Sequence, residues 1–189
     1  MPTSDGELAR QALAGSQEAY RTLVARYASA AVNMAARIVN DRALAEDLAQ
    51  DAFVRAFARL KTYDPARRFS AWFFQILHNI AIDYLRRKRV ATLSLDELQA
   101  AGYPGPPTDD PSSSPVLDLE RKALGAALSD ALDRIRSEYR EAILLRYQQG
   151  LSVDEIAGVL EIPEGTVKTY LHRGRKELAG LLTAAGWKP

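Results

Sequence analysis

The chain has 189 residues, which suffices for one ordinary domain or two small ones. Its apolar fraction of 47% can build hydrophobic cores. No apolar run approaches the roughly 20 residues that span a bilayer, and the N-terminus lacks a basic-then-apolar signal pattern, so we expect a soluble, cytoplasmic protein. The sequence has no cysteine, and its two histidines, His78 and His172, are far apart, so we expect no disulfide, no metal and no cofactor.

The net charge of +1 hides an uneven distribution. Residues 1–92 carry 14 basic and 9 acidic residues, residues 93–120 carry 6 acidic and no basic residues, and residues 121–189 carry 11 basic and 9 acidic residues. Two basic blocks joined by an acidic segment indicate two anion-binding units and a linker. Ordinary scatter of charge is the alternative.

The first basic block has the apolar periodicity of a helical domain, which we place at residues 1–90. An amphipathic helix is predicted over residues 16–39, with Ser16 as its N-cap. A second helix is predicted from Asp41 to Lys61 and a third from Ser70 to about Lys88, separated by a loop.

Residues 91–115 change in composition. Proline, serine, glycine and aspartate dominate this stretch, which can sustain neither a helix nor a central strand. We predict an extended, solvated linker here.

Helical periodicity returns in residues 116–189 and predicts four segments, at about 116–135, 137–148, 152–160 and from the turn at residues 161–163 to about Leu182. No stretch of the chain alternates with a period of two, so the predicted fold class is all-α, with two small domains. The expected apolar stripe of the first segment consists of Leu117, Leu124, Leu128, Leu132 and Ile135.

Residues 152–178 have the layout of a helix-turn-helix motif. Ser152 and Glu155 form a capping box before a short helix, and a tight turn leads into a longer basic helix. Ala157 is expected where the two helices approach each other. The inward positions of the motif should be Ile156, Ala157, Leu160, Val167, Leu171, Gly174 and Leu178.

Burial of these positions leaves a basic face on the longer helix, suited to contact base edges and phosphates in a major groove. An ordinary solvated helix face is the alternative, and His172 alone is a weak signal. Tyr170 could either pack or contact the DNA backbone. The candidate DNA-binding residues are Lys168, Thr169, His172, Arg173, Arg175 and Lys176.

Two pairs of motifs resemble one known family. Residues 139–157 and 164–178 resemble the fourth conserved region of bacterial RNA polymerase sigma factors, and residues 45–57 and 69–87 resemble the second. Both regions occur in the family's order, and with the linker they cover nearly the whole chain. The chain resembles the compact, two-domain extracytoplasmic-function (ECF) group. Pro163 departs from the small capping residue common in the family, which affects only how the helix begins.

The resemblance implies a function for each surface. Region 4 would recognise the promoter −35 element through the basic helix. Region 2 would melt the −10 element and hold a flipped base near the third helix and its preceding loop. An exposed aromatic ring, amides and a basic helix end are suited to bind single-stranded DNA there. The implied −10 residues are Trp72, Gln75, Asn79, Arg86, Arg67 and Arg68. Trp72 could instead belong partly to the core.

An acidic face on the second helix would bind the polymerase clamp in this family, although a solvated face is the alternative. Its residues are Glu46, Asp47, Gln50, Asp51 and Val54. The implied partners are core RNA polymerase, promoter DNA and, as in many family members, an anti-sigma factor.

Two rival functions remain at this point. A stand-alone regulator would bind operators through residues 152–178, but it would leave both N-terminal faces without a role. An enzyme such as a recombinase needs an activated nucleophile, and the sequence offers no Ser or Tyr in such a setting. We therefore expect that the protein is not an enzyme.

Overall fold

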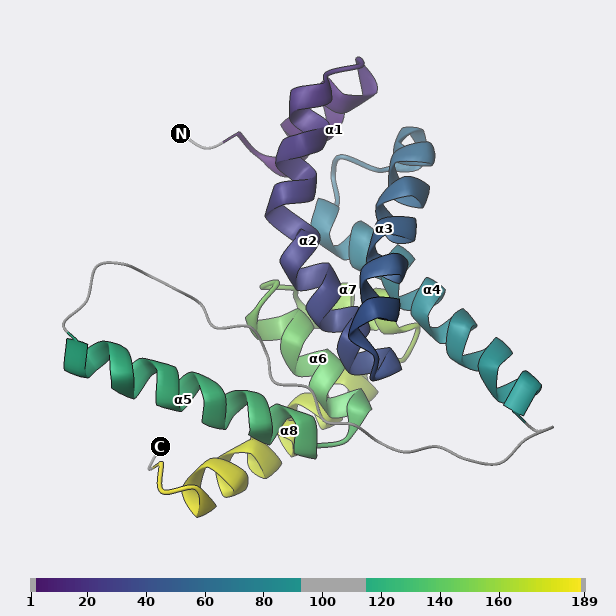
Figure 1. Ribbon diagram of the computed structural model, residues 1–189. Helices are drawn as coiled ribbons and strands as arrows, with labels where there is room; N and C mark the ends of the chain where they lie inside the picture. The colour runs from purple at the N-terminus through teal and green to yellow at the C-terminus, as the bar shows by residue number, and fades with distance from the viewer. Residues whose placement is uncertain (1–2, 93–114, 188–189) are drawn as a thin grey trace.

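The computed structural model describes residues 3–92 and 115–187 of the chain, and the side chains of residues 3–89 and 122–187. Throughout these ranges the secondary structure is helical, and no strand occurs in them (Figure 1). The helices are α1 (Asp5–Leu13), α2 (Gln17–Val39), α3 (Arg42–Ala58), the 3₁₀ turn η1 (Leu60–Thr62), α4 (Phe69–Thr92), α5 (Pro115–Arg134), α6 (Ser137–Tyr147), α7 (Val153–Leu160) and α8 (Glu164–Ala184). The predicted all-α fold is confirmed, whereas the predicted linker lies almost wholly outside the described residues.

The N-terminal helices begin where their capping residues predict. The side chain of Ser16 accepts a hydrogen bond from the backbone N–H of Ala19, and Asp41 does the same for Leu44. Helix α3 ends at Ala58 and residues 60–62 form a 3₁₀ turn, so the second helix is shorter than predicted. The third predicted helix, α4, begins one residue earlier, at Phe69, and continues to Thr92.

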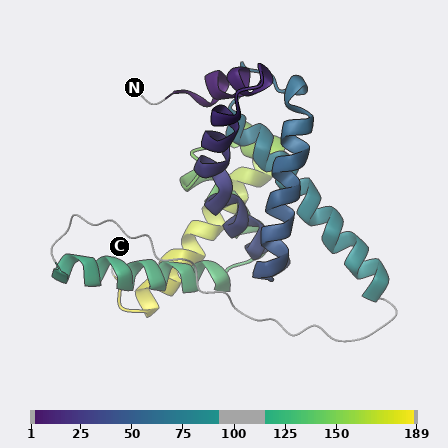
Figure 2. The same ribbon diagram turned by 45° about the horizontal axis from the view of Figure 1, so that its top comes forward.

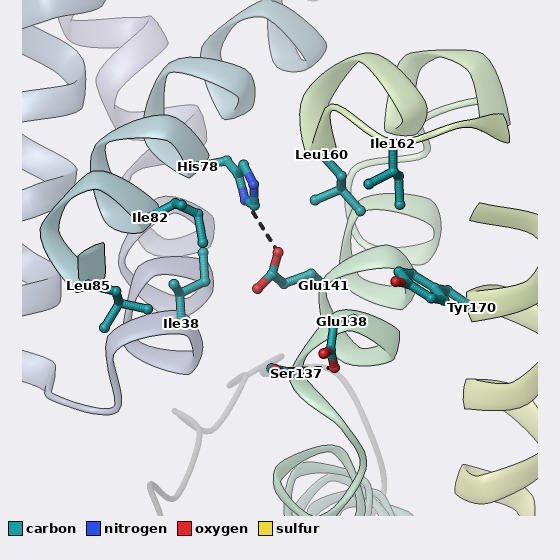
Figure 3. Close-up of a pocket in the computed structure, with 10 residues that line it drawn as sticks. All are labelled: Ile38, His78, Ile82, Leu85, Ser137, Glu138, Glu141, Leu160, Ile162 and Tyr170. Atoms are coloured by element: carbon teal, nitrogen blue, oxygen red, sulfur yellow. Dashed lines mark hydrogen bonds and ion pairs between the residues drawn. The ribbon is translucent and has the colours of Figure 1, made fainter. Parts of the chain in front are cut away.

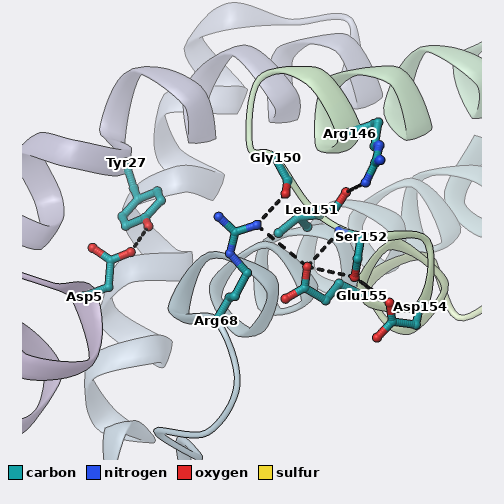
Figure 4. Close-up of polar contacts among 9 residues, drawn as sticks. All are labelled: Asp5, Tyr27, Arg68, Arg146, Gly150, Leu151, Ser152, Asp154 and Glu155. Atoms are coloured by element: carbon teal, nitrogen blue, oxygen red, sulfur yellow. Dashed lines mark hydrogen bonds and ion pairs between the residues drawn. The ribbon is translucent and has the colours of Figure 1, made fainter.

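Helix α1 was not predicted. Ser4 caps it by accepting a hydrogen bond from the N–H of Glu7, and Leu8, Ala9 and Ala12 bury one face. The pair of Ser4 with Glu7 three residues later is a start signal that could have revealed this helix. The carboxylate of Asp5 accepts a hydrogen bond from the Tyr27 hydroxyl and thereby joins α1 to α2 (Figure 4).

Aromatic rings fill the core of the N-terminal half. Phe53 of α3 stacks on Phe73 of α4 with 4.5 Å between ring centroids, and Tyr27 of α2 contacts Phe73 and Phe74. Offset and edge-on contacts of this kind add to the free energy of apolar burial. Burial, reinforced by the hydrogen bond to Asp5, raises the pKa of Tyr27. The core therefore holds α2, α3 and α4 in one arrangement.

The C-terminal half packs α6, α7 and α8 around buried apolar residues. All the predicted inward positions are buried except Ala157, which is only half-buried. The close approach occurs instead at Gly174, where an added Cβ would lie 2.6 Å from Cδ1 of Ile143 and 3.0 Å from Cβ of Tyr139. Glycine at this position lets α8 lie directly against α6.

The apolar stripe predicted for α5 is only partly buried, and the prediction is wrong for its middle residues. Leu132 and Ile135 are buried, but Leu124 and Leu128 are 41% and 40% exposed. The reason is that α5 runs outward beyond the bundle and keeps α8 as its neighbour (Figure 1). Leu117 lies outside the residues whose side chains are described.

The two halves of the chain pack against each other. Helix α4 lies against α7, and α2 lies against α6, so segments that are far apart in the sequence meet at one interface (Figure 2). The C-terminal end of α4 extends beyond this interface, away from the other helices (Figure 1). The fold therefore leaves the basic end of α4 open while covering its middle.

Candidate nucleic-acid and polymerase interfaces

The basic face of α8 is fully presented to the surface. Val167, Leu171, Gly174 and Leu178 are buried against α6 and α7, so the residues between them point outward. The exposed residues are the six predicted ones, Lys168, Thr169, His172, Arg173, Arg175 and Lys176. The helix-turn-helix geometry thus brings the whole predicted set onto one face.

Several of these side chains have partners within the protein. The Thr169 hydroxyl donates to the carbonyl of Gly165 at 2.9 Å, and Nε of Arg175 donates to the carbonyl of Leu171 at 3.2 Å. Lys168 lies 3.7 Å from the Glu164 carboxylate, one helical turn away. These contacts are local and largely solvent-exposed, so a DNA phosphate or base edge can replace them at low cost.

Tyr170 packs against the protein. Its ring centroid lies 5.4 Å from that of Tyr139 in α6, and the side chain is half-buried. The hydroxyl of Tyr139 also engages Arg173, which raises the pKa of Arg173. Tyr139 therefore packs directly against Tyr170 of α8.

The predicted −10 residues begin with a loop that is held in place by Tyr63. Its buried hydroxyl donates to the carbonyl of Arg67 at 2.7 Å, and Arg67 and Arg68 are exposed. Trp72 lies 5.4 Å from the Tyr63 ring and 5.6 Å from Phe69, measured between centroids, and is half-buried. One side of the indole thus belongs to the core, as the alternative interpretation foresaw.

The remaining members of this set follow α4. Gln75 is half-buried, while Asn79 and Arg86 are exposed. Arg86 lies 3.5 Å from Asp83 and is followed by the exposed residues Arg87 to Arg89, on the part of α4 that extends outward. The amides and cations therefore lie along one helix, from the loop to its basic end.

The predicted polymerase-binding residues lie on the solvent side of α3. Glu46, Asp47, Gln50 and Val54 are exposed, and Asp51 is half-exposed. Val54 is 66% exposed, the highest value among the exposed large hydrophobic residues of the described part of the chain. Glu46 pairs with Arg42 at 3.0 Å and Asp51 with Arg55 at 2.8 Å, both across one helical turn. The face is acidic with one apolar residue, as predicted.

Two of the predicted −10 residues contact the other half of the chain. Nδ2 of Asn79 donates to Oε1 of Glu161 at 3.1 Å. Arg68 donates to the carbonyl of Gly150 and lies 3.9 Å from the Glu155 carboxylate (Figure 4). Glu155 also accepts from the N–H of Ser152 and so completes the predicted capping box.

A second contact between the halves involves residues that the sequence did not single out. Arg37 of α2 forms an ion pair with Asp133 of α5, and the Arg37 side chain is only 8% exposed. Arg140 of α6 donates to the carbonyl of Asp133 at 2.8 Å and lies 3.9 Å from its carboxylate. Burial lowers the pKa of Arg140, and Asp133 opposes this effect. No periodicity could reveal this cluster, because Arg37 and Asp133 lie 96 residues apart.

A cavity of about 300 Å³ lies between the halves (Figure 3). Apolar side chains from both halves line it, among them Ile38, Ile82 and Leu160. Nδ1 of His78 lies 3.3 Å from Oε2 of Glu141 across the interface, without the alignment of a hydrogen bond, so the pair attracts strongly only when the imidazole is protonated. The halves therefore meet without complete packing.

Within residues 3–92 and 115–187, no helix is long and apolar enough to cross a membrane. In that part of the chain no three His, Cys, Asp or Glu side chains are grouped so as to hold a metal ion.

Comparisons with known proteins identify both halves. The family model "Sigma-70 region 2" matches residues 23–90, and "Sigma-70, region 4" matches residues 125–178. The ECF RNA polymerase sigma factor SigW of Bacillus subtilis is 33% identical over 173 residues, which cover 89% of this chain and 91% of SigW. The RNA polymerase sigma factor CnrH of Cupriavidus metallidurans is 33% identical over 186 residues, which cover 96% of this chain and 95% of CnrH.

The fold is shared as well. The structure of CnrH in complex with the cytosolic domain of CnrY matches with a TM-score of 0.63 and 31% identity, over 96% of this chain and 99% of that one. Two family regions in the expected order, an all-helical fold and relatives matched along nearly their whole length lead to one conclusion. The chain belongs to the ECF RNA polymerase sigma factors, transcription initiation factors that direct RNA polymerase to promoters.

Proposed function

We propose that each surface described above performs one step of promoter recognition. The basic face of α8 enters the major groove of the −35 element, where its lysines and arginines contact base edges and phosphates. Binding of α8 to the −35 element is supported by the exposure of all six predicted side chains on one face of a capped helix-turn-helix. No chemical step is required of the protein.

The loop before α4 and the exposed side of that helix hold the single-stranded −10 element. Trp72 offers one free side of an aromatic ring, Gln75 and Asn79 offer amides, and Arg67, Arg68 and Arg86 neutralise phosphates. Unstacking costs a few kcal/mol per base, which stacking and phosphate contacts offset. In this proposal residues 1–90, 91–115 and 116–189 are the −10 domain, the linker and the −35 domain.

The acidic face of α3 docks on a basic surface of core RNA polymerase. Val54 supports this proposal, because an apolar side chain with 66% exposure gains free energy when a partner covers it. We place the protein with the polymerase in the cytoplasm, and we expect an anti-sigma factor as a further partner, as in many members of the family.

A run-off transcription assay tests the proposal. Core RNA polymerase is mixed with a library of promoter sequences, with and without the protein. Specific start sites are expected only when the protein is present. A stand-alone regulator would instead bind duplex DNA without co-purifying with core polymerase, and that result would exclude the proposed function.

A further inference from the structure

Helix α1 lies outside both regions that define the family. The match to "Sigma-70 region 2" covers residues 23–90, whereas α1 spans Asp5–Leu13. One apolar face of α1 is buried, and the helix lies beside α2, η1 and α4. Since η1 and α4 flank residues 63–68, α1 borders the loop to which we assign the −10 strand.

Asp5, in the first turn of α1, contacts two residues of α2. One of its carboxylate oxygens accepts a hydrogen bond from the hydroxyl of Tyr27 (Figure 4), and the other forms an ion pair with Arg26. Arg26 also donates to the carbonyl of Thr3 at 3.2 Å. A hydrogen bond to a carboxylate is stronger than one between neutral groups, and Tyr27 is only 7% exposed. Asp5 therefore fixes the position of the Tyr27 ring.

The Tyr27 ring is connected to the loop by one buried residue, Phe69. The centroids of the Tyr27 and Phe69 rings are 5.6 Å apart. Phe69 in turn lies 5.5 Å from the ring of Tyr63 and 5.6 Å from that of Trp72. Because buried rings are closely packed, a shift of Tyr27 would displace Phe69 and then both of its neighbours. A continuous series of aromatic contacts thus joins Asp5 to the loop.

Tyr63 and Trp72 set the geometry of the −10 surface. The hydroxyl of Tyr63 donates to the carbonyl of Arg67 at 2.7 Å and so holds the loop. Trp72 is half-buried, with one side against Tyr63 and Phe69. A base can stack only on the other side, and only where the ring presents it. The orientation of the indole therefore decides how well the −10 strand binds.

We propose that Asp5 is a positioning residue for the −10 strand. Through the rings of Tyr27 and Phe69, it holds the indole of Trp72 in the orientation on which a base stacks. The same contacts hold the loop of residues 63–68. The inference rests on the proposed role of this loop and of Trp72 in binding single-stranded DNA.

The test uses holoenzyme, formed from core RNA polymerase and the full chain, and a promoter found in the run-off assay. Asp5→Ala and Tyr27→Phe remove the same hydrogen bond from its two ends. Glu7→Ala is the matched control, because it removes an equal charge from the first turn of α1, where the Glu7 carboxylate is bonded to Arg10 and Gln11 of the same helix. Asp5→Asn is the conservative variant, because its amide oxygen can still accept from Tyr27.

Affinity for promoter DNA with a single-stranded −10 element is measured by fluorescence anisotropy. We expect Asp5→Ala and Tyr27→Phe each to lower this affinity about fivefold, the lower end of what stacking of one base contributes. The double variant should lose no more than either single one, because both act through one hydrogen bond. Glu7→Ala and Asp5→Asn should keep the original affinity, and all variants should bind core polymerase equally well.

The emission of Trp72 provides a second measurement, made on the free protein. The chain has two tryptophans, so Trp187→Phe leaves Trp72 as the only one. In this background Asp5→Ala should move the emission to longer wavelength and increase its quenching by acrylamide, whereas Glu7→Ala should change neither. A residue that only stabilised α1 would lower the midpoint of unfolding without moving this signal.

Three results would overturn the positioning role of Asp5. The first is an unchanged Trp72 emission with unchanged DNA affinity in Asp5→Ala and Tyr27→Phe. The second is an equal loss of affinity in Asp5→Ala and Glu7→Ala, and the third is additive losses in the double variant. The proposed function is tested separately, because specific starts in the run-off assay are measured with the unsubstituted protein.

Discussion

Gly174 lies where α8 crosses α6, and its lack of a side chain sets the distance between these helices. A Cβ there would lie 2.6 Å from Ile143 and 3.0 Å from Tyr139, whereas a Cβ at Gly180 in the same helix meets nothing within 4 Å. Tyr139 in turn packs against Tyr170 on α8. A change at Gly174 therefore reaches the DNA-binding face.

We predict that Gly174→Ala lowers the free energy of unfolding by about 1–3 kcal/mol, because the added methyl group overpacks the contact with Ile143. Gly180→Ala is the control and should raise it by up to about 1 kcal/mol, because alanine favours an exposed helix. Urea unfolding followed by circular dichroism measures both. Equal effects of the two substitutions would show that α8 and α6 are not in such close contact.

At the scale of single elements, α8 and α3 each carry one exposed functional face. The contacts of Lys168 and Arg175 lie within α8 itself, so both side chains can be removed without unfolding the motif. The carboxylates of α3 are likewise paired with arginines one turn away.

Lys168→Ala combined with Arg175→Ala should weaken binding to −35 duplex DNA and lower promoter selectivity, while binding to core polymerase is unchanged. Loss of two phosphate or base contacts should also reduce the slope of log affinity against log salt by about 2. Fluorescence anisotropy over a salt series measures this slope. Unchanged selectivity and slope would remove α8 from the DNA interface.

Asp47→Lys combined with Asp51→Lys should weaken binding to core polymerase, because the reversed charges repel a basic docking surface. The control, Glu18→Lys with Asp130→Lys, makes the same total change of charge at exposed positions on other helices. Surface-immobilised core polymerase measures both affinities. If the two variants bound equally well, the face on α3 would not be the docking site.

At the scale of the whole molecule, the buried pair of Arg37 and Asp133 joins residues of the two halves. Alanine substitution of each residue, and of both, forms a double-mutant cycle in unfolding free energy. We expect a coupling of about 1–3 kcal/mol, since the pair is largely shielded from water. The exposed pair Arg42 and Glu46 should show only about 0.3–0.5 kcal/mol. A coupling no larger than that of the exposed pair would mean that the halves are not held together at this point in solution.

The sequence alone determined the fold class, most helices and the exposed face of α8. The start of a helix can be predicted from its capping residue, here Ser16, Asp41 and Ser152. This is possible because the hydrogen bonds and caps of a helix join residues only three or four positions apart. The face of α8 followed from the same periodicity, since burial of one side of a helix leaves the other side exposed. Helix α1 was missed although its cap, Ser4, gives the same kind of signal.

Only the tertiary structure decided which faces are covered. Leu124 and Leu128 have the spacing of core residues, yet α5 extends beyond the bundle and leaves them exposed. Asn79 was correctly predicted to lie away from its own domain's core, but its partner, Glu161, lies 82 residues further along the chain. Contacts of this range depend on how separate helices pack, and no local pattern encodes them. Periodicity therefore describes each helix, while the meeting of the two halves follows from packing alone.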